Sequence, residues 1–376
     1  MDEVFNWQIR RKMPYQYPGT RPKRQFAMVF DTNKCIACQT CSLACKTTWT
    51  SGAGQEYMMW NNVETKPYGG FPLGWETRLL ELLGAGSWGA DSYAGKTIFE
   101  AAPPGERVLG YRPHEGDWAY PNLAEDEIGG GSVTRGMHLT VPHKVYQFYL
   151  PRICGHCTYP ACLAACPRQA IYKREEDGIV LIDQERCRGY GECIRACPYK
   201  KTMYNVVSRT SEKCIGCYPK VEQGLVTQCA ANCIGKIRVM GFVSPPEQAR
   251  ADNPVDFLVH VRNIALPLYP QYGLETNVYY IPPIHAPLKY LTQMFGPGVE
   301  KAIEAYRNAP QDPLLVGLMT LTGATETIMH RFTVEGGNAR AFDDKGNQIA
   351  DVPVTEPIVT RPAYDEKLQV FRHNIT

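Results

Sequence analysis

The spacing of fifteen cysteines is the feature that most constrains this chain of 376 residues. None lies between Cys45 and Cys154, and none follows Cys233. A disulfide framework favours a short chain and an even number of cysteines, and this chain has neither. The four groups are Cys35-x2-Cys38-x2-Cys41-x3-Cys45, Cys154-x2-Cys157-x4-Cys162-x3-Cys166, Cys187-x5-Cys193-x3-Cys197 and Cys214-x2-Cys217-x11-Cys229-x3-Cys233. Bunched groups of this kind indicate ligands rather than disulfide bonds.

The first group has the C-x2-C-x2-C-x3-C spacing of bacterial ferredoxins, and Pro167 and Pro198 follow the second and third groups directly. In that pattern three closely spaced thiolates surround one iron–sulfur cluster, and the fourth ligates the neighbouring cluster. Structural zinc also uses C-x2-C pairs, but normally as two separated pairs without the third and fourth cysteines. Four such groups in one chain therefore predict iron–sulfur clusters.

If groups one and four pair by this cross-ligation, and groups two and three do the same, every cysteine is used. The predicted ligand sets are Cys35, Cys38, Cys41 and Cys233 (site 1); Cys45, Cys214, Cys217 and Cys229 (site 2); Cys154, Cys157, Cys162 and Cys197 (site 3); and Cys166, Cys187 and Cys193 (site 4). Site 4 has three thiols because Tyr190 stands where a cysteine belongs. Three thiolates most simply hold a [3Fe–4S] cluster, so we expect three [4Fe–4S] clusters and one [3Fe–4S] cluster. We expect Tyr190 to fill the vacant corner, with ligation by its phenolate as the alternative.

The segments around the cysteines predict an α+β fold. Residues 26–30 and 236–240 read as strands that flank groups one and four, and residues 170–182 read as a hairpin between groups two and three. We expect two nested bacterial-ferredoxin-like modules, a long irregular insertion and a helical C-terminal extension. The expected boundaries are 1–45 with 205–242 for the first module, 46–150 for the insertion, 151–204 for the second module and 243–376 for the extension.

The distribution of charged residues agrees with a chain that buries iron–sulfur clusters. The net charge of +2 gives no bulk reason to expect nucleic-acid or membrane binding. Residues 151–205 carry nine Lys/Arg against six Asp/Glu. Some of these cations are expected to compensate the negative charge of buried clusters, and the others to be ordinary surface charges. His156 is expected to donate a hydrogen bond near a cluster, or to pack, rather than to bind iron.

The rest of the chain carries no catalytic motif. There is no P-loop, and Gly129-Gly130-Gly131 is not followed by a dinucleotide-binding pattern. No apolar stretch approaches the roughly 18–20 residues that span a bilayer, and Arg10-Arg11-Lys12 precedes no apolar segment typical of a secretion signal. We expect an irregular surface excursion over residues 84–131, helices at 255–266 and after Asp312, and a hairpin turn at 342–349.

Together the four cysteine groups, the aromatic residue at position 190, the segment 64–70 and the C-terminal tail resemble a known family. It is the iron–sulfur β subunit of the nitrate reductase and nitrite oxidoreductase branch of the dimethyl sulfoxide reductase superfamily of molybdoenzymes. Selenate, chlorate and perchlorate reductases, dimethylsulfide dehydrogenase and ethylbenzene dehydrogenase belong to the same branch. Residues 3–8 and 35–41 look most similar to nitrite oxidoreductase and its nitrate-reducing relatives. Nitrate reductases typically have Trp where this chain has Tyr190.

The resemblance implies an electron-transfer subunit without a catalytic residue of its own. It would relay single electrons between a molybdopterin-containing α subunit, docked in part on residues 46–150, and a haem b γ subunit or c-type cytochrome. Site 1 would face the α subunit and site 4 the haem side. The chain would reach the periplasm by co-export with a partner that bears a twin-arginine signal; the alternative is a cytoplasmic, membrane-associated complex that contacts the membrane only through partners. A self-contained enzyme and a zinc-binding interaction protein are the alternative functions.

Overall fold

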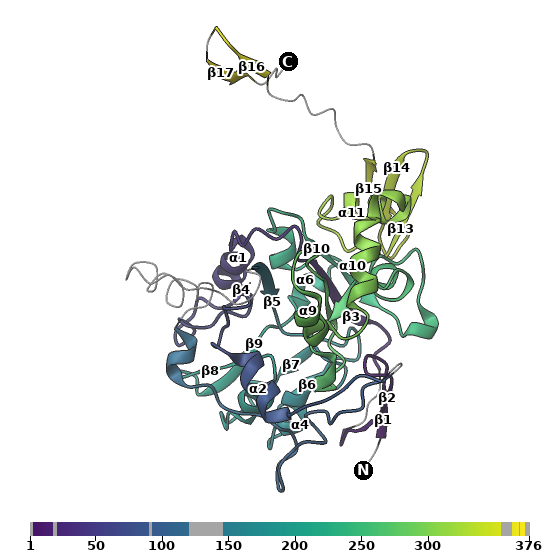
Figure 1. Cartoon of the computed structure of the whole chain (residues 1–376). Coiled ribbons are helices and arrows are strands. Elements are labelled where there is room, and N and C mark those ends of the chain that lie inside the picture. The colour runs from purple at the N-terminus through teal and green to yellow at the C-terminus, as the bar shows by residue number, and fades with distance from the viewer. Residues whose placement is uncertain are drawn as a thin grey trace, which may run out of the picture.

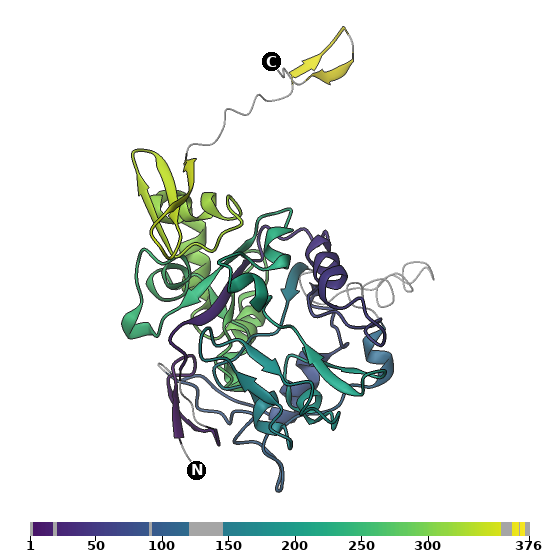
Figure 2. The same ribbon diagram turned by 180° about the vertical axis from the view of Figure 1, so that it is seen from behind.

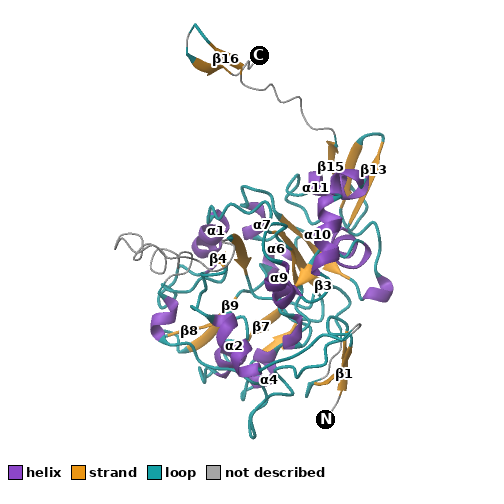
Figure 3. Ribbon diagram, in the orientation of Figure 1, coloured by secondary structure: helices purple, strands orange, loops and turns teal. Residues whose placement is uncertain are grey.

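The computed structural model describes residues 3–17, 21–89, 92–119, 146–354, 363–367 and 369–372. Short helices and strands joined by long loops make up these ranges (Figure 3). The many turns agree with a content of 33 glycines and 29 prolines. None of the helices in the described ranges has the length and apolar character that a membrane crossing requires. The mixture of helices and strands confirms the predicted α+β class.

A four-stranded sheet lies at the centre of the fold, and β3 (Gln25–Asp31) is one of its inner strands. β10 (Arg238–Val243) pairs antiparallel with β3 on one side, and β12 (Val278–Ile281) pairs parallel with it on the other. β11 (Leu266–Pro267) forms the edge next to β12. Every residue of β3 is buried, as expected for a strand covered on both faces. β3 and β10 confirm the two predicted strands.

The cysteine-bearing segments form short helices and hairpins around this sheet (Figure 1). α1 (Thr40–Trp49) packs against α7 (Gln228–Ala231), and α4 (Ala161–Ala165) packs against α5 (Glu192–Ala196). The antiparallel pair β6 (Ile171–Lys173) and β7 (Val180–Ile182) confirms the predicted hairpin at residues 170–182. A second hairpin joins β8 (Thr202–Asn205) to β9 (Thr210–Lys213), and α6 (Tyr218–Val221) follows it.

The first part of the insertion is more regular than the sequence suggested. β4 (Asn62–Lys66) pairs antiparallel with β5 (Phe148–Arg152), and α2 (Trp75–Leu83) follows β4. Irregular chain then runs to a 3-10 helix at Glu115–Trp118, as expected for the excursion. The part of the predicted excursion beyond residue 119 lies outside the described residues. The expectation of an irregular insertion was therefore wrong for residues 62–83.

Buried charges explain why this part of the insertion is ordered. Glu64 accepts hydrogen bonds from Nε of Arg152 at 2.7 Å and from Nε1 of Trp75 at 3.1 Å. Nζ of Lys66 lies 3.2 Å from Glu64 and also contacts Glu76. Burial alone would raise the pKa of Glu64, but Arg152 and Lys66 hold it below its ordinary value. The ion pairs join β4, β5 and α2, and so fix Arg152 two residues before the first cysteine of group two.

The C-terminal extension is a mixture of helices and strands rather than helical. Its helices are α8 (Pro254–Asp256) with a π-helical turn at Phe257–Val261, α9 (Leu288–Phe295), α10 (Val299–Arg307) and α11 (Pro313–Leu321). Its 3-10 turns are Pro246–Gln248, Pro270–Tyr272 and Ala309–Gln311. β13 (Arg331–Glu335), β14 (Asn338–Phe342) and β15 (Gln348–Pro353) form an antiparallel sheet. Buried and half-buried residues alternate along β14, as is typical of a strand with one face on the core. The turn from β14 into β15 confirms the predicted hairpin turn at residues 342–349.

Two small hairpins complete the described chain. The N-terminal hairpin joins β1 (Glu3–Asn6) to β2 (Arg11–Pro14), and the C-terminal one joins β16 (Ala363–Asp365) to β17 (Val370–Arg372). The sheet of β13, β14 and β15 lies at one end of the main body and the N-terminal hairpin at the other (Figure 1 and Figure 2).

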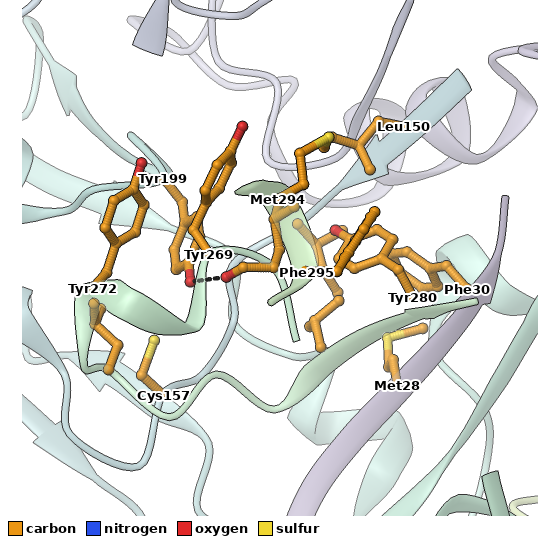
Figure 4. Packing of buried hydrophobic residues seen from close by; sticks show 14 of the residues in the cluster. Met28, Phe30, Leu150, Cys157, Tyr199, Tyr269, Tyr272, Tyr280, Met294 and Phe295 are labelled. Carbon is orange, nitrogen blue, oxygen red and sulfur yellow. Dashed lines mark hydrogen bonds between the residues drawn. The ribbon is translucent and has the colours of Figure 1, made fainter. Parts of the chain in front are cut away.

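An aromatic core connects the central sheet to the cysteine groups. Tyr269 and Tyr272 stack with their ring centroids 5.2 Å apart, and Tyr199 Oη donates to the Leu268 carbonyl at 2.6 Å. Figure 4 shows Cys157 beside these rings, and Phe30 with Tyr280 at the other end of the same cluster. The thiols are therefore embedded in apolar packing, where charge is costly.

Replacing Asp312 by Ala tests the local account of the extension. Asp312 Oδ1 accepts from the backbone N–H groups of Leu314 and Leu315 at 3.1 and 3.2 Å, and caps α11. Asp312 also forms an ion pair with Arg262, and the loss of the cap together with this partly exposed pair costs about 1–2 kcal/mol. We expect the amide hydrogens of α11 to exchange about 5–30 times faster in hydrogen-exchange mass spectrometry. Asp344→Ala, at an exposed turn position, is the control and should leave α11 unchanged.

Candidate metal centres

Three cavities are each lined by one of the predicted sets of four cysteines. Their atom-free volumes are similar, about 330, 350 and 360 Å³ with the open solvent at their mouths included. All fifteen cysteines lie in the described residues and none forms a disulfide bond. The cavities are lined by Cys35, Cys38, Cys41 and Cys233 (site 1), by Cys45, Cys214, Cys217 and Cys229 (site 2), and by Cys154, Cys157, Cys162 and Cys197 (site 3). The structure thus brings each set together, and their role as iron ligands stays a prediction.

The three cysteines of site 4 also lie close to one another. Burial raises the pKa of Cys193 to about 12; Ser211 opposes the shift, and the neighbouring Cys166 and Cys187 add to it. The backbone N–H groups of Ala170 and Ser211 donate to the sulfurs of Cys166 and Cys187, both at 3.3 Å. Such donors suit sulfurs that carry negative charge.

Tyr190 belongs to the same loop as Cys187 and Cys193, but 59% of it is exposed. Its carbonyl accepts a hydrogen bond from Arg112 at 2.8 Å, which ties the loop to the insertion. Tyr190 therefore lies largely at the surface. Its predicted role beside a three-iron cluster remains untested.

Left-handed backbone residues shape the loops between the cysteines. They turn the chain so that successive thiols face one space, and the non-glycine members are strained conformations that persist only where their surroundings enforce them. Gln39, at φ 59°, is held by a hydrogen bond from its Nε2 to the Val63 carbonyl at 3.1 Å. The residues concerned are Ala37, Gln39, His156, Gly189, Gly191, Gly216 and Cys217.

The x3 spacing at the end of each group links neighbouring sites. Cys41 and Cys45 both lie on α1 and are buried, one turn apart, but they line different cavities. One helical turn therefore carries the chain from site 1 to site 2. The pair Cys229 and Cys233 makes the same link, and the pairs 162 with 166 and 193 with 197 link sites 3 and 4 in the sequence-predicted sets.

Buried cations accompany the thiols. Lys200, Lys201 and Lys213 are at most 3% exposed, and Nζ of Lys213 donates to the Cys214 carbonyl at 2.7 Å. Burial lowers the pKa of Lys200 and of Lys201 to about 7, while nearby thiols oppose that shift. By contrast Arg168 and Arg186, from the same basic segment, are exposed. Both buried and exposed cations occur in this segment, and the role of the buried ones beside clusters stays a prediction. Lys213 lies outside the segment 151–205 and was missed.

His156 fits the predicted role of a hydrogen-bond donor. It is fully buried and lines the site 3 cavity. Its Nδ1 accepts from the backbone N–H of Val180 at 3.1 Å, which assigns the ring proton to Nε2. Burial holds the pKa of His156 well below its ordinary value, so the ring is neutral. Nε2 has no partner among the described residues and is available as a donor.

The donor sets fit clusters better than single zinc ions. Zinc with bonds of about 2.3 Å holds its thiolates roughly 3.8 Å apart. In the described ranges no three His, Cys, Asp or Glu side chains converge closely enough to share one metal ion. At site 2, Nε1 of Trp60 lines the cavity without a partner in the same ranges. Cluster sulfurs are the acceptors that such buried N–H groups lack.

Comparison with known proteins agrees with this geometry. The family described as "4Fe-4S dicluster domain" matches residues 145–243. The chain is 43% identical over 309 residues to the selenate reductase subunit beta of Thauera selenatis, covering 75% of this chain and 89% of the relative. It is 42% identical over 317 residues to the chlorate reductase subunit beta of Ideonella dechloratans, with the same coverage. It is 32% identical over 441 residues to the respiratory nitrate reductase 2 beta chain of Escherichia coli, covering 88% and 85%.

The chain belongs to the family of β subunits of molybdoenzymes in the dimethyl sulfoxide reductase superfamily. The predicted resemblance is confirmed, and with it a ferredoxin-like iron–sulfur domain and the role of an electron-transfer subunit. The particular likeness to nitrite oxidoreductase stays a prediction.

Substituting Cys41 and Cys45 separately tests the cross-ligation. Although both are on α1, we expect Cys45→Ala to alter the same electron paramagnetic resonance (EPR) signal as Cys229→Ala. Cys41→Ala should alter the signal that Cys233→Ala alters. If Cys41→Ala and Cys45→Ala changed one and the same signal, the assignment of the two cysteines to different sites would be wrong. Iron content, measured in parallel, shows how many clusters each variant retains.

Proposed function

We propose that this chain relays single electrons through three [4Fe–4S] clusters and one [3Fe–4S] cluster, held at sites 1 to 4. The electrons pass between a molybdopterin-containing catalytic subunit and a haem b subunit or c-type cytochrome. The observation that supports this is the division of fifteen thiols into four neighbouring sets with none left over. Bound clusters exchange one electron at a time, so the protein has only to hold them and set their potentials.

The order of the sites supports a linear relay. Helical turns link site 1 to site 2 and site 3 to site 4, as described above. Besides burial, the nearby Cys154 of site 3 raises the pKa of Cys214 of site 2, which indicates that the two sites are neighbours. The positive charge of Lys213 opposes the rise in the pKa of both Cys162 of site 3 and Cys214 of site 2. The order 1–2–3–4 follows, with sites 1 and 4 at the ends.

The packing of the short helices favours two nested modules. α1 packs on α7 in the outer module, with residues 1–45 and 205–242, and α4 packs on α5 in the inner module, with residues 151–204. We propose that residues 46–150 help to dock the catalytic subunit and that residues 243–376 contact partners. Because β12 pairs with β3, the extension shares the sheet of the outer module. A periplasmic location through co-export with a partner is part of the same proposal.

Apolar side chains around site 1 support docking of the catalytic subunit there. Cys38 is exposed, and Ile36, Leu43 and Ile234 are 64%, 61% and 63% exposed. Large apolar side chains that gather at the surface mark protein interfaces. Since the three come from chain segments that carry site 1 ligands, a partner seated on them would lie close to that site. At the other end, the exposed Tyr190 marks the side for the haem partner.

Ile234→Asp tests the docking surface. A carboxylate in an apolar interface must be desolvated, so we expect affinity for the catalytic subunit to fall at least tenfold, or about 1.4 kcal/mol. The iron content should not change, because the side chain is exposed. The control is Val206→Asp, which introduces the same group at a residue that is 65% exposed on the β8–β9 turn. Equal binding by both variants, measured by titration of the separated subunits, would exclude this surface.

Iron analysis and redox titration of the intact complex test the proposal as a whole. We expect about fifteen iron atoms per chain, one EPR signal of an oxidised three-iron cluster, and signals of reduced four-iron clusters. Markedly fewer iron atoms, or no three-iron signal, would overturn the assignment. Turnover of an oxyanion substrate by this chain without a partner would contradict the role of a relay.

Tyr190→Cys restores the regular spacing of group three. We expect a fourth iron atom to enter site 4, because a fourth thiolate then completes the ferredoxin pattern. The oxidised three-iron EPR signal should be lost, and the iron content should rise by about one atom per chain. Tyr190→Ser, which removes the ring without adding a thiol, is the control and should keep the three-iron signal. An unchanged signal in Tyr190→Cys would count against this account of site 4.

A further inference from the structure

Arg238 is a buried cation whose hydrogen bonds are incomplete. It begins β10, is 5% exposed, and its guanidinium carbon lies 4.4 Å from the ring centre of Phe30. Nη2 donates to Asn61 Oδ1 at 3.1 Å, but Nε and Nη1 have no partner among the described residues. Burying a cation with two unpaired donors is costly. Acceptors for these two groups are therefore expected next to them.

The position of Arg238 relates it to two sites at once. Arg238 lines the site 1 cavity, and Asn61, its hydrogen-bond partner, lines the site 2 cavity. The hydrogen bond between them thus crosses the wall that separates the two cavities. Burial alone would lower the pKa of Arg238, but thiols of both sites, Cys41 and Cys229 foremost, hold it above its ordinary value.

Arg238 differs from Arg152, another buried arginine, in its charge partners. Arg152 is also buried, but it is neutralised by Glu64. In the described parts of the chain no carboxylate forms an ion pair with Arg238, and the groups that favour its charge are thiols. Its positive charge is therefore left to act on the two sites.

We infer that Arg238 is a shared counter-charge for sites 1 and 2 and raises the reduction potential at both. Arg238 also positions the site 1 cluster, because its Nε and Nη1 groups donate hydrogen bonds to sulfur atoms at that site. The inference rests on the proposed function, because it needs clusters at both sites. Reduction adds one electron, and so one negative charge, at a site. A fixed positive charge in a poorly solvated region stabilises that reduced form, and a single residue in the shared wall acts on two neighbours.

The test is a potentiometric EPR titration of the intact complex carrying Arg238→Gln. We expect the potentials of sites 1 and 2 to fall together, each by a tenfold or greater change in the equilibrium constant of one-electron reduction, which is about 59 mV. Sites 3 and 4 should move less. Arg238→Lys keeps the charge and should leave both potentials nearer to the wild type. The signals are assigned with the Cys41→Ala and Cys45→Ala variants.

Lys236→Gln is the matched control, because it removes one positive charge from an exposed side chain two residues earlier. Solvent screens that charge, so its removal should shift neither potential by as much. A shift as large as that of Arg238→Gln would mean that burial is not the cause, and would overturn the inference. So would Arg238→Gln with full iron content in which neither potential, or only one, moves.

Loss of clusters from Arg238→Gln is also informative. If sites 1 and 2 lose iron together and Arg238→Lys keeps both, a shared positive charge is required there and the inference stands. If both variants lose iron at one site alone, the shared role is wrong. Absence of iron–sulfur signals from the wild-type complex would instead overturn the proposed function.

Discussion

The structure depends on charge compensation around thiols in an apolar core. Cys157 packs beside Tyr199 and Tyr272 in the largest cluster of buried side chains, where an uncompensated thiolate is strongly disfavoured. Lys200, Lys201, Lys213 and Arg238 bring positive charge into the same region without exposure to solvent. Burial lowers the pKa of Lys200 and raises that of Cys162, while a neighbouring thiol and Lys213, respectively, oppose these two shifts. The buried cations and thiols can compensate one another's charge, and the iron and sulfide of a bound cluster would be the third component of this electrostatic assembly.

The fold brings segments far apart in sequence to this assembly. The loop before site 1 is held by Thr32 Oγ1, which donates to the carbonyl of Ile281 at 2.7 Å, and by Tyr306, which donates to Asp31 at 3.0 Å. The insertion contributes Asn61 and the ion pairs of Glu64. The segments outside the ferredoxin-like region therefore act as its supports.

The cysteine groups and the hairpin beside them were predictable because both follow from local spacing, and the cross-ligation pattern of bacterial ferredoxins then paired the groups into sets. The sequence did not predict the parallel pairing of β12 with β3, which joins residues some 250 positions apart and has no local signal. The ordered part of the insertion was missed for the same reason: Glu64 needs Arg152, 88 positions later. Arg238 was overlooked because charge was counted within residues 151–205, whereas burial beside two sites is visible only in three dimensions. Tyr190 was expected to fill the vacant corner of site 4; the residue is largely exposed, and its position relative to a cluster stays a prediction.

Exposure divides the four sites into ends and middle. Site 1 has the exposed Cys38 and an apolar rim, and site 4 has the exposed Tyr190. In the proposed order sites 2 and 3 lie between them, lined by buried residues such as Trp60 and His156. In the described ranges, exposed side chains at sites 1 and 4 offer partners a surface at both ends of the proposed order. A linear order with accessible ends suits a relay between two separate proteins, because each partner can then exchange electrons with the cluster nearest to it.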